Sequence, residues 1–184
     1  MKIYFGADHA GFDLKEELVE YLRDEGYEVI DKGAYQNVKG DDYPEYIAPV
    51  AEIVSSNPNT ARGIILGGSG QGEAIVANRF SNVRAIVFNG QYQPKDGRKV
   101  PNEIVISREH NDSNILSLGA RFLSIKEAKE AVKLWLETPF PGEVRHKRRI
   151  SKIDDIARKK ICTTVNIRTN LLGSGSKTKK PKLS

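Results

Sequence analysis

A short apolar run that opens onto a glycine-rich turn is the feature that most constrains how this chain can fold. Residues 63–66, Gly-Ile-Ile-Leu, predict a strand covered on both faces, and residues 73–80 predict the helix that follows it. Glycines between them allow positive φ and a close approach of the backbone to a ligand. These glycines are Gly67, Gly68, Gly70 and Gly72. Such a turn, at the start of a helix, binds a phosphate or a developing oxyanion.

The same turn carries one hydroxyl, one amide and one carboxylate, from Ser69, Gln71 and Glu73. Glu73 is a candidate general base because it stands beside the anion-binding backbone. No Lys-Ser or Lys-Thr pair follows, so the turn is not a P-loop, and a dinucleotide fingerprint would stand earlier in the chain. The alternative is a glycine-rich connector in which Glu73 only favours a helix N-terminus.

Strand and helix patterns alternate along the chain, which predicts a parallel sheet between helices. We therefore expect a Rossmann-like α/β/α fold with five parallel strands. The expected strands are 2–7, 27–31, 62–66, 83–88 and 115–118, and the expected helices are 12–25, 43–56, 73–80, 125–137 and 144–160. We predict one domain over residues 1–160 and a basic, disordered tail over 161–184.

All three histidines lie in polar clusters next to predicted strand or helix ends. Asp8 and His9 follow the first strand, so they should face the same crevice as the glycine turn. His110 belongs to the run 108–112, and His146 belongs to the basic run 145–149, whose cations line one face of a helix. A solvated surface histidine is the alternative for each of them, but three in such clusters favour a site.

The positive charge of the chain is concentrated at its C-terminal end. Residues 144–184 hold 13 Lys and Arg against 2 Asp and Glu, whereas residues 1–143 hold 16 against 22, so these parts carry +11 and −6 and sum to +5. An acidic body with a basic end does not indicate a nucleic-acid-binding domain, although the tail could contact RNA weakly. No stretch approaches the roughly 18 apolar residues of a membrane span, and we expect a cytoplasmic protein.

Six separated motifs resemble the type B ribose-5-phosphate isomerases, in the wider family that includes hexose-6-phosphate isomerases. The motifs are residues 8–11, 42–44, 67–73 with 77–78, 109–112, 118–121 and 145–149, within a resemblance that covers about residues 1–158. The resemblance implies an aldose–ketose isomerase of the non-oxidative pentose phosphate pathway, which interconverts D-ribose 5-phosphate and D-ribulose 5-phosphate through a cis-enediolate.

The family has a cysteine-base and a glutamate-base version, and this chain resembles the second. Gly67 occupies the position of the cysteine and Glu73 that of the glutamate, while the single cysteine, Cys162, lies outside the resemblance. The resemblance makes Glu73 the catalytic base. Backbone N–H groups of the turn, with the Ser69 hydroxyl, would stabilise the enediolate oxygen.

The resemblance also implies the remaining site residues. His110 would act as the acid–base group for ring opening and Asn111 would hold a sugar hydroxyl, while either histidine, His9 or His110, could open the ring. Hydroxyls near the ring oxygen would be held by Asp8 and His9. The phosphate would be bound by Arg121, Arg145 and Arg149, with His146 and Tyr43 as further contacts, and Gly68, Gly70, Gln71 and Gly72 would line the site.

The resemblance further implies a homodimer, with a tetramer as the alternative, in which Arg145 and Arg149 serve the neighbouring subunit's site. No cofactor or metal is expected, because no spacing of carboxylates and histidines indicates a ligand set. The segment 89–103 is about ten residues longer than the family pattern, and a loop of this kind can be a lid over the crevice or a surface insertion. A hexose 6-phosphate isomerase, of allose or galactose type, and a non-catalytic sugar-phosphate-binding protein are the alternative functions.

Overall fold

The structure is a computed structural model that describes residues 1–156. The strands are β1 (Lys2–Ala7), β2 (Glu28–Asp31), β3 (Ala61–Gly67), β4 (Ala85–Phe88) and β5 (Ile115–Gly119). The helices are α1 (Phe12–Asp24), α2 (Tyr43–Ser56), α3 (Gln71–Ala77), α4 (Glu103–Asn111) and α5 (Ile125–Glu137). A further helical stretch, which we call the C-terminal helix, covers residues 144–156.

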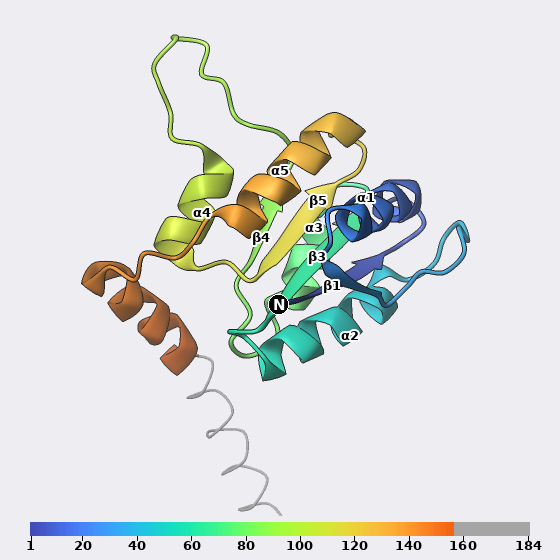
Figure 1. The fold of residues 1–184 in the computed structure, drawn as a ribbon, viewed down its shortest axis with the longest axis horizontal. Coiled ribbons are helices and arrows are strands. Elements are labelled where there is room, and N and C mark those ends of the chain that lie inside the picture. The colour runs from blue at the N-terminus through green and yellow to red at the C-terminus, as the bar shows by residue number, and fades with distance from the viewer. Residues whose placement is uncertain (157–184) are drawn as a thin grey trace, which may run out of the picture.

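The strands form one parallel sheet in the order β2-β1-β3-β5-β4 (Figure 1). The register aligns Ala7 with Leu66 and Gly67 with Gly119, so the strands β1, β3 and β5 end together at one edge of the sheet. The chain leaves β1 toward β2 on one side and returns through β3 on the other. Such a reversal of strand order opens a crevice beyond the carboxyl ends of the strands. The predicted parallel α/β fold is confirmed.

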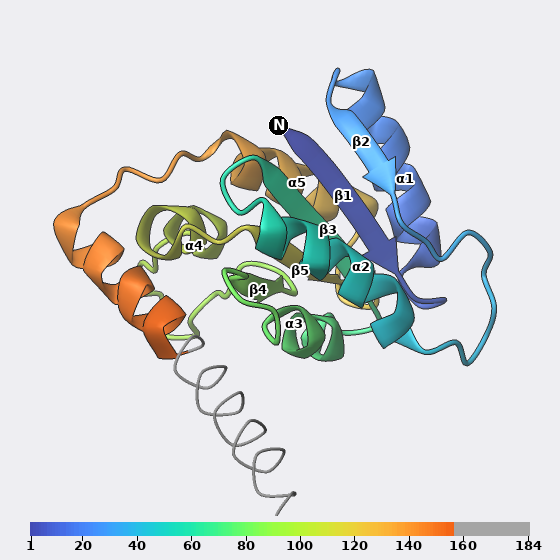
Figure 2. The ribbon, with the colours of Figure 1, turned by 90° about the horizontal axis from the view of Figure 1, so that it is seen from below.

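Helices cover both faces of the sheet (Figure 2). α1, α4 and α5 lie on one face, and α2 and α3 lie on the other. Successive side chains of β3 alternate between these layers, with Ile64 and Leu66 in the core under α1 and α5 and Ile65 in the core under α2. Both faces are therefore apolar, which explains the continuous apolar run that predicted this strand.

Two helices differ from the expected ones. α3 begins two residues earlier than predicted, because Gly70 takes a left-handed conformation with φ 73° and ends the turn there. α4 was not predicted, although Asn102 caps it by accepting a hydrogen bond from the Val105 N–H. The C-terminal helix is confirmed as far as residue 156, whereas the remainder of its predicted range and the tail 161–184 lie outside the described residues.

No helix within residues 1–156 combines the length and the apolar character that crossing a membrane requires.

A buried ion pair joins the first helix to the edge strand. The Lys15 side chain is completely buried, and its ammonium group donates to the carboxylates of Asp31 in β2 and of Glu16. The Glu16 side chain is half exposed, so Asp31 is the more shielded partner. Removing one partner of a buried pair leaves a desolvated charge without compensation.

We expect Asp31→Asn to lower the free energy of unfolding by about 3 kcal/mol, because the Lys15 ammonium group stays buried. Denaturant unfolding followed by circular dichroism measures this change. Glu28→Gln is the matched control, since it removes a carboxylate of the same strand from a solvent-exposed pair with Lys2. Equal transition midpoints for the two variants would contradict the prediction.

Candidate active site

The crevice at the carboxyl edge of the sheet holds a cavity of ≈ 320 Å³. It is formed by the segments that follow β1, β3 and β5 together with the first residues of α2 and α3. The lining residues are Asp8, Ala10, Tyr43, Gly68, Ser69, Gly72, Glu73, Arg121 and Phe122. Seven of the predicted site residues therefore meet in one pocket of a single chain.

Three side chains of this pocket lie where glycines leave space on the turn. A Cβ atom on Gly67 would stand only 1.8 Å from Glu73 Oε1. A Cβ on Gly68 would stand 2.9 Å from the guanidinium carbon of Arg121, and a Cβ on Gly72 would stand 2.8 Å from the Tyr43 ring. The glycines are thus required by close packing, because any side chain would displace the acidic, basic or aromatic group above it.

Two polar side chains hold the turn from beneath. The Ser117 hydroxyl donates to the Gly70 carbonyl at 2.7 Å, and the Asn89 amide donates to the Ser69 carbonyl at 3.1 Å. Within residues 1–156 the N–H groups of Gly68, Ser69 and Gly70 have no hydrogen-bond acceptor. The turn is therefore suited to binding an oxyanion, because its carbonyl groups are fixed by hydrogen bonds and its N–H groups are free to donate.

Glu73 is almost completely buried, with an exposed fraction of 4%. Burial raises the pKa of this carboxyl group above its ordinary value of 4.5, and the neighbouring charge of Asp8 raises it further. A hydrogen bond from the backbone lowers the pKa and opposes part of this shift. A carboxylate whose pKa is displaced toward neutrality is suited to taking a proton and returning it.

Asp8 and His9 follow the end of β1, and Asp8 lines the pocket with Glu73. Asp8 Oδ1 accepts hydrogen bonds from the N–H groups of Ala10 at 3.0 Å and Gly11 at 3.1 Å. His9 Nδ1 lies 2.6 Å from Oδ1 of Asp41, a residue that was not predicted. The possible ligand atoms of Asp8, His9 and Asp41 lie within 4.8 Å of one another, so these three are the residues that could hold a cation here.

The other predicted residues form a second cluster, on α4 and the C-terminal helix. The rings of His110 and His146 stack with centroids 4.4 Å apart and an interplanar angle of 9°. His146 is buried, and its Nε2 accepts a hydrogen bond from Arg145 Nε at 3.1 Å. Burial lowers the pKa of His146, and the charges of Arg145 and of His110 lower it further. The ring is therefore neutral, and it supports His110 and Arg145 from one side.

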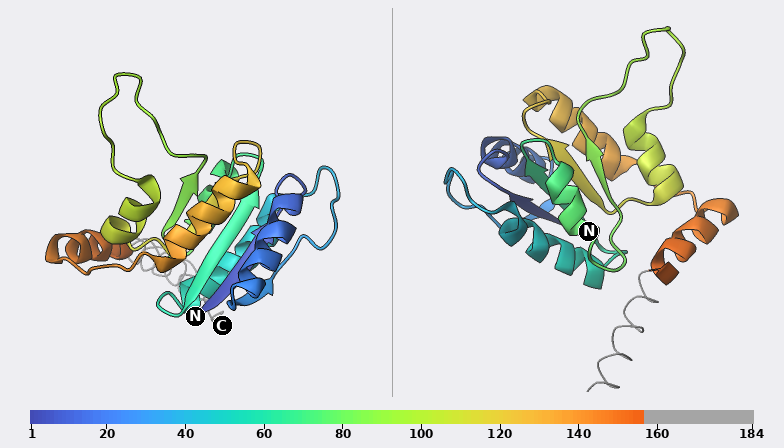
Figure 3. Two further views of the ribbon diagram at one scale, coloured as in Figure 1. Left: turned by 45° about the horizontal axis from the view of Figure 1, so that its top comes forward. Right: turned by 180° about the vertical axis from the view of Figure 1, so that it is seen from behind.

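The C-terminal end of α4 lies near the amino edge of the sheet, and the C-terminal helix lies beside it (Figure 3). α4 runs back from the carboxyl end of β4 and ends at Asn111, just before β5 begins at Ile115. The five residues of β5 separate the edges by roughly 16 Å at about 3.3 Å per residue. Within one chain, His110, Asn111, Arg145, His146 and Arg149 therefore do not reach a small molecule held at Glu73.

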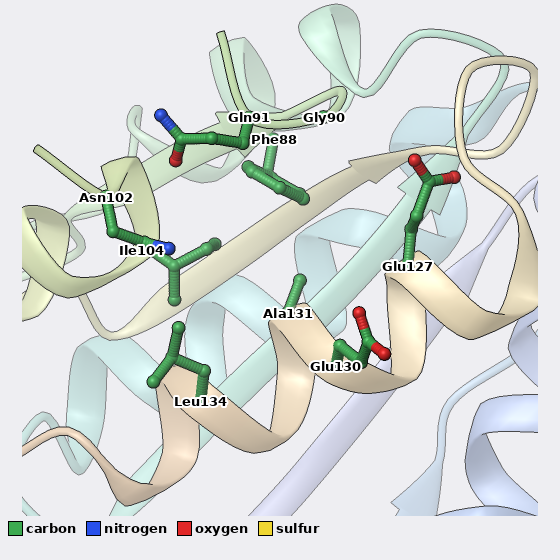
Figure 4. Close-up of a pocket in the computed structure, with 9 residues that line it drawn as sticks. All are labelled: Phe88, Gly90, Gln91, Asn102, Ile104, Glu127, Glu130, Ala131 and Leu134. Carbon is green, nitrogen blue, oxygen red and sulfur yellow. The ribbon is translucent and has the colours of Figure 1, made fainter. Parts of the chain in front are cut away.

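The predicted insertion 89–103, whose last residue begins α4, borders a different cavity, of ≈ 230 Å³, between α4 and α5 (Figure 4). Its floor is apolar, from Phe88, Ile104 and Leu134, and its rim is polar, with Gln91 and Glu130 among the side chains. None of its lining residues borders the pocket around Glu73. Within one chain, the insertion does not cover the predicted site.

Two predicted residues belong to the glycine turn without lining the pocket. Gly70 supplies the left-handed turn, and Gln71 is exposed at the start of α3. Asp41 and Asn89 were missed because each acts through a hydrogen bond to a residue distant in the sequence, 32 and 20 positions away. No local pattern marks such contacts.

A parallel α/β sheet whose carboxyl edge carries a buried carboxyl group with a raised pKa, an arginine and free backbone N–H groups is suited to acid–base chemistry on a small anionic molecule. The ribose/galactose isomerase family model matches residues 3–153. The chain therefore belongs to the ribose/galactose isomerase family.

Several characterised relatives support this assignment. The chain is 38% identical to ribose-5-phosphate isomerase B of Escherichia coli (strain K12) over 159 residues, which are 86% of this chain and 98% of that protein. Ribose-5-phosphate isomerase B of Clostridium thermocellum is similar in structure, with a TM-score of 0.76, 41% identity and coverage of 87% of this chain and 99% of that one. The enzyme of Mycoplasma genitalium, solved with bound ribulose-5-phosphate, gives a TM-score of 0.77 at 30% identity and covers 85% of this chain and 96% of that one.

The raised pKa of Glu73 predicts a pH-dependent cost in stability. Between pH 4.5 and the raised pKa the folded chain binds more protons than the unfolded chain, so the stability falls as the pH rises through this window. We expect Glu73→Gln to raise the melting temperature at pH 8, and this gain should shrink as the pH falls and vanish below the ordinary pKa.

Thermal unfolding at a series of pH values tests this expectation, with Glu20→Gln as the control. Glu20 is an exposed glutamate of α1, so its replacement should leave the pH dependence unchanged. A Glu73→Gln variant that is less stable than the parent at pH 8 would contradict the prediction.

Proposed function

We propose that this chain is an aldose–ketose isomerase that interconverts D-ribose 5-phosphate and D-ribulose 5-phosphate. The observation that carries the proposal is the buried Glu73 carboxylate, which fills the space above Gly67 and lines the same pocket as Gly68 and Ser69 of the turn. The names of the relatives and the bound ribulose-5-phosphate in one of them support the same substrate class.

The reaction moves one hydrogen from C2 to C1 and one from O2 to O1. In the open-chain aldose, Glu73 removes the proton from C2, and the electron pair of that bond forms the C1–C2 double bond while the C1 carbonyl oxygen becomes an oxyanion. The N–H groups of residues 68–70 and the Ser69 hydroxyl stabilise this enediolate, and one such donor is worth about 2.7–4 kcal/mol. Transfer of the hydroxyl proton from O2 to O1 and return of the carbon-bound proton from Glu73 to C1 complete the ketose.

The second cluster, on α4 and the C-terminal helix, completes the site from a second copy of the chain. We call it the amino-edge cluster. A two-fold dimer would bring the partner's own α4 and C-terminal helix to the pocket around Glu73, and both sites would form alike. Exposed apolar side chains near both regions offer a surface for this contact. They are Ile75, Phe122, Val144 and Ile153.

In the completed site the arginines bind the phosphate and His110 opens the sugar ring. Arg121 lines the pocket in the same chain as Glu73, whereas Arg145 and Arg149 come from the partner. Guanidinium groups match the geometry of a phosphate dianion. His110, also from the partner, would transfer the ring-opening proton, and Asn111 would hold a hydroxyl. We further propose that this enzyme is cytoplasmic and acts in the non-oxidative pentose phosphate pathway.

We expect the purified protein to isomerise ribose 5-phosphate in the presence of EDTA, with lower rates for allose 6-phosphate and galactose 6-phosphate. Glu73→Gln should reduce kcat by about 10²–10⁴-fold while ribose 5-phosphate still binds, because the amide cannot take the proton. Unchanged turnover would refute the assignment of the base. A preference for a hexose phosphate would replace the proposed substrate, and binding without turnover by the parent would make the chain a sugar-phosphate-binding protein.

Mixing two inactive variants tests the shared site. Glu73→Gln subunits mixed with subunits that carry Arg145→Ala and Arg149→Ala should regain roughly a quarter of the parental activity after random exchange, since half of the dimers are mixed and each has one intact site. Glu73→Gln mixed with Arg121→Ala is the control and should regain nothing, because both residues belong to the same half of the site. No recovery in the first mixture, despite subunit exchange shown by mass spectrometry, would place the whole site in one chain.

A further inference from the structure

Asp41, which was not among the predicted site residues, contacts the predicted site residue His9. Asp41 lies at the end of the loop between β2 and α2, and most of its neighbours in this loop are exposed. Its side chain nevertheless has an exposed fraction of only 7%. It turns inward to His9, which follows β1, and this contact ties the loop to the carboxyl edge of the sheet.

Three contacts join Asp41 to His9. The His9 N–H group donates to both carboxylate oxygens at 3.1 Å, and His9 Nδ1 lies 2.6 Å from Oδ1. The Asp41 carboxylate thus holds both the backbone N–H group and the ring of His9. An ionised carboxylate only accepts hydrogen bonds, so the proton of the neutral imidazole must reside on Nδ1.

This arrangement fixes the chemical character of the other ring nitrogen. With the proton on Nδ1, Nε2 of the neutral ring carries a lone pair and accepts a hydrogen bond. No group within residues 1–156 bonds to Nε2. The side chain of His9 is 28% exposed and its Nδ1 lies 3.9 Å from Oδ2 of Asp8, which lines the pocket with Glu73. The free nitrogen is therefore available beside the substrate pocket.

We propose that Asp41 is a positioning residue that holds His9 in the tautomer whose Nε2 accepts a hydrogen bond from a hydroxyl group of the sugar phosphate. The inference rests on the proposed function for the identity of the ligand. It adds to that function the residue that orients His9 and the direction of the hydrogen bond. Replacing a residue that orients a metal-binding histidine commonly costs about 10–100-fold, and we expect a loss of the same order for this metal-free histidine.

The same contacts argue against a cation bound between these side chains. Nδ1 points at Asp41, and both oxygens of Asp41 already receive the N–H group of His9. A metal ion bound to Nδ1 would have to displace the proton that makes the 2.6 Å contact. A proton between the two groups accounts for the geometry without an ion.

The first test is a double-mutant cycle on the activity of the full-length protein. Asp41→Asn should lower kcat/KM by about 10–100-fold, and it should have little further effect in a His9→Gln background. The control is Glu45→Gln, which removes a nearby exposed charge and leaves the His9 contact intact. An equal loss from Asp41→Asn in both backgrounds would overturn the proposal, because Asp41 would then act independently of His9. Melting temperatures identify any variant that fails to fold.

The second test does not depend on turnover. Imidazole ¹⁵N chemical shifts of His9, assigned with the His9→Gln variant, should show the proton on Nδ1 in the parent and a shift toward the other tautomer in Asp41→Asn. A parent spectrum with the proton on Nε2 would overturn the proposal even in an active enzyme. If the protein turns over no sugar phosphate while the Nδ1 tautomer is found, the proposed function fails and the Asp41–His9 positioning still stands. A change of the His9 signals upon addition of Mn²⁺ or Zn²⁺ at stoichiometric concentration would instead indicate a metal site, and this result would overturn the proposal.

Discussion

The absence of a side chain at residue 67 is the constraint on which the site depends. The Glu73 carboxylate lies where a Cβ of Gly67 would stand, so the acid–base group is pressed against the end of β3. This position buries the carboxylate and raises the pKa of Glu73. The same turn carries the backbone N–H groups of Gly68, Ser69 and Gly70, which have no hydrogen-bond acceptor within residues 1–156. A larger side chain at position 67 and the Glu73 side chain would compete for the same volume, so the burial of this carboxylate requires glycine at position 67.

The fold could be predicted from the sequence because both faces of the sheet are apolar and the helices alternate with the strands. Ile64, Ile65 and Leu66 are all completely buried, and this uniform burial appears in the sequence as an unbroken apolar run. α4 was missed because its first turn follows a proline-rich and glycine-rich loop and its C-terminal residues were interpreted as a site motif. The start of α3 was misplaced because the conformation of Gly70 cannot be read from residue type alone. Asp41 and Asn89 could not be found, since their partners are distant in the chain.

In the proposed dimer, α4, which the sequence did not predict, determines which of the predicted site residues come from the partner. α4 runs antiparallel to the strands, so residues at its C-terminal end emerge at the edge opposite to the glycine turn. Asp112 ends this helix in a left-handed conformation with φ 45°, and its carboxylate binds Arg108 at 2.8 Å and Arg84 at 2.9 Å. These ion pairs fix the helix end beside His110 and Asn111. The amino edge of the sheet therefore presents a rigid cluster rather than a mobile loop.

Electrostatics give this division a consequence for substrate binding. The pocket of one chain contains the acidic residues Asp8 and Glu73 and a single arginine, Arg121, so its charge does not favour a phosphate dianion. Addition of Arg145 and Arg149 from a second copy in the proposed dimer would change the formal charge of these groups from −1 to +1. The stacked and neutral His146 contributes no competing charge to the amino-edge cluster, and its ring accepts a hydrogen bond from Arg145. In the proposed dimer, Arg145 and Arg149 would thus lie on the edge of each subunit opposite to Asp8 and Glu73, and only Arg121 would share an edge with these carboxylates before the site is assembled.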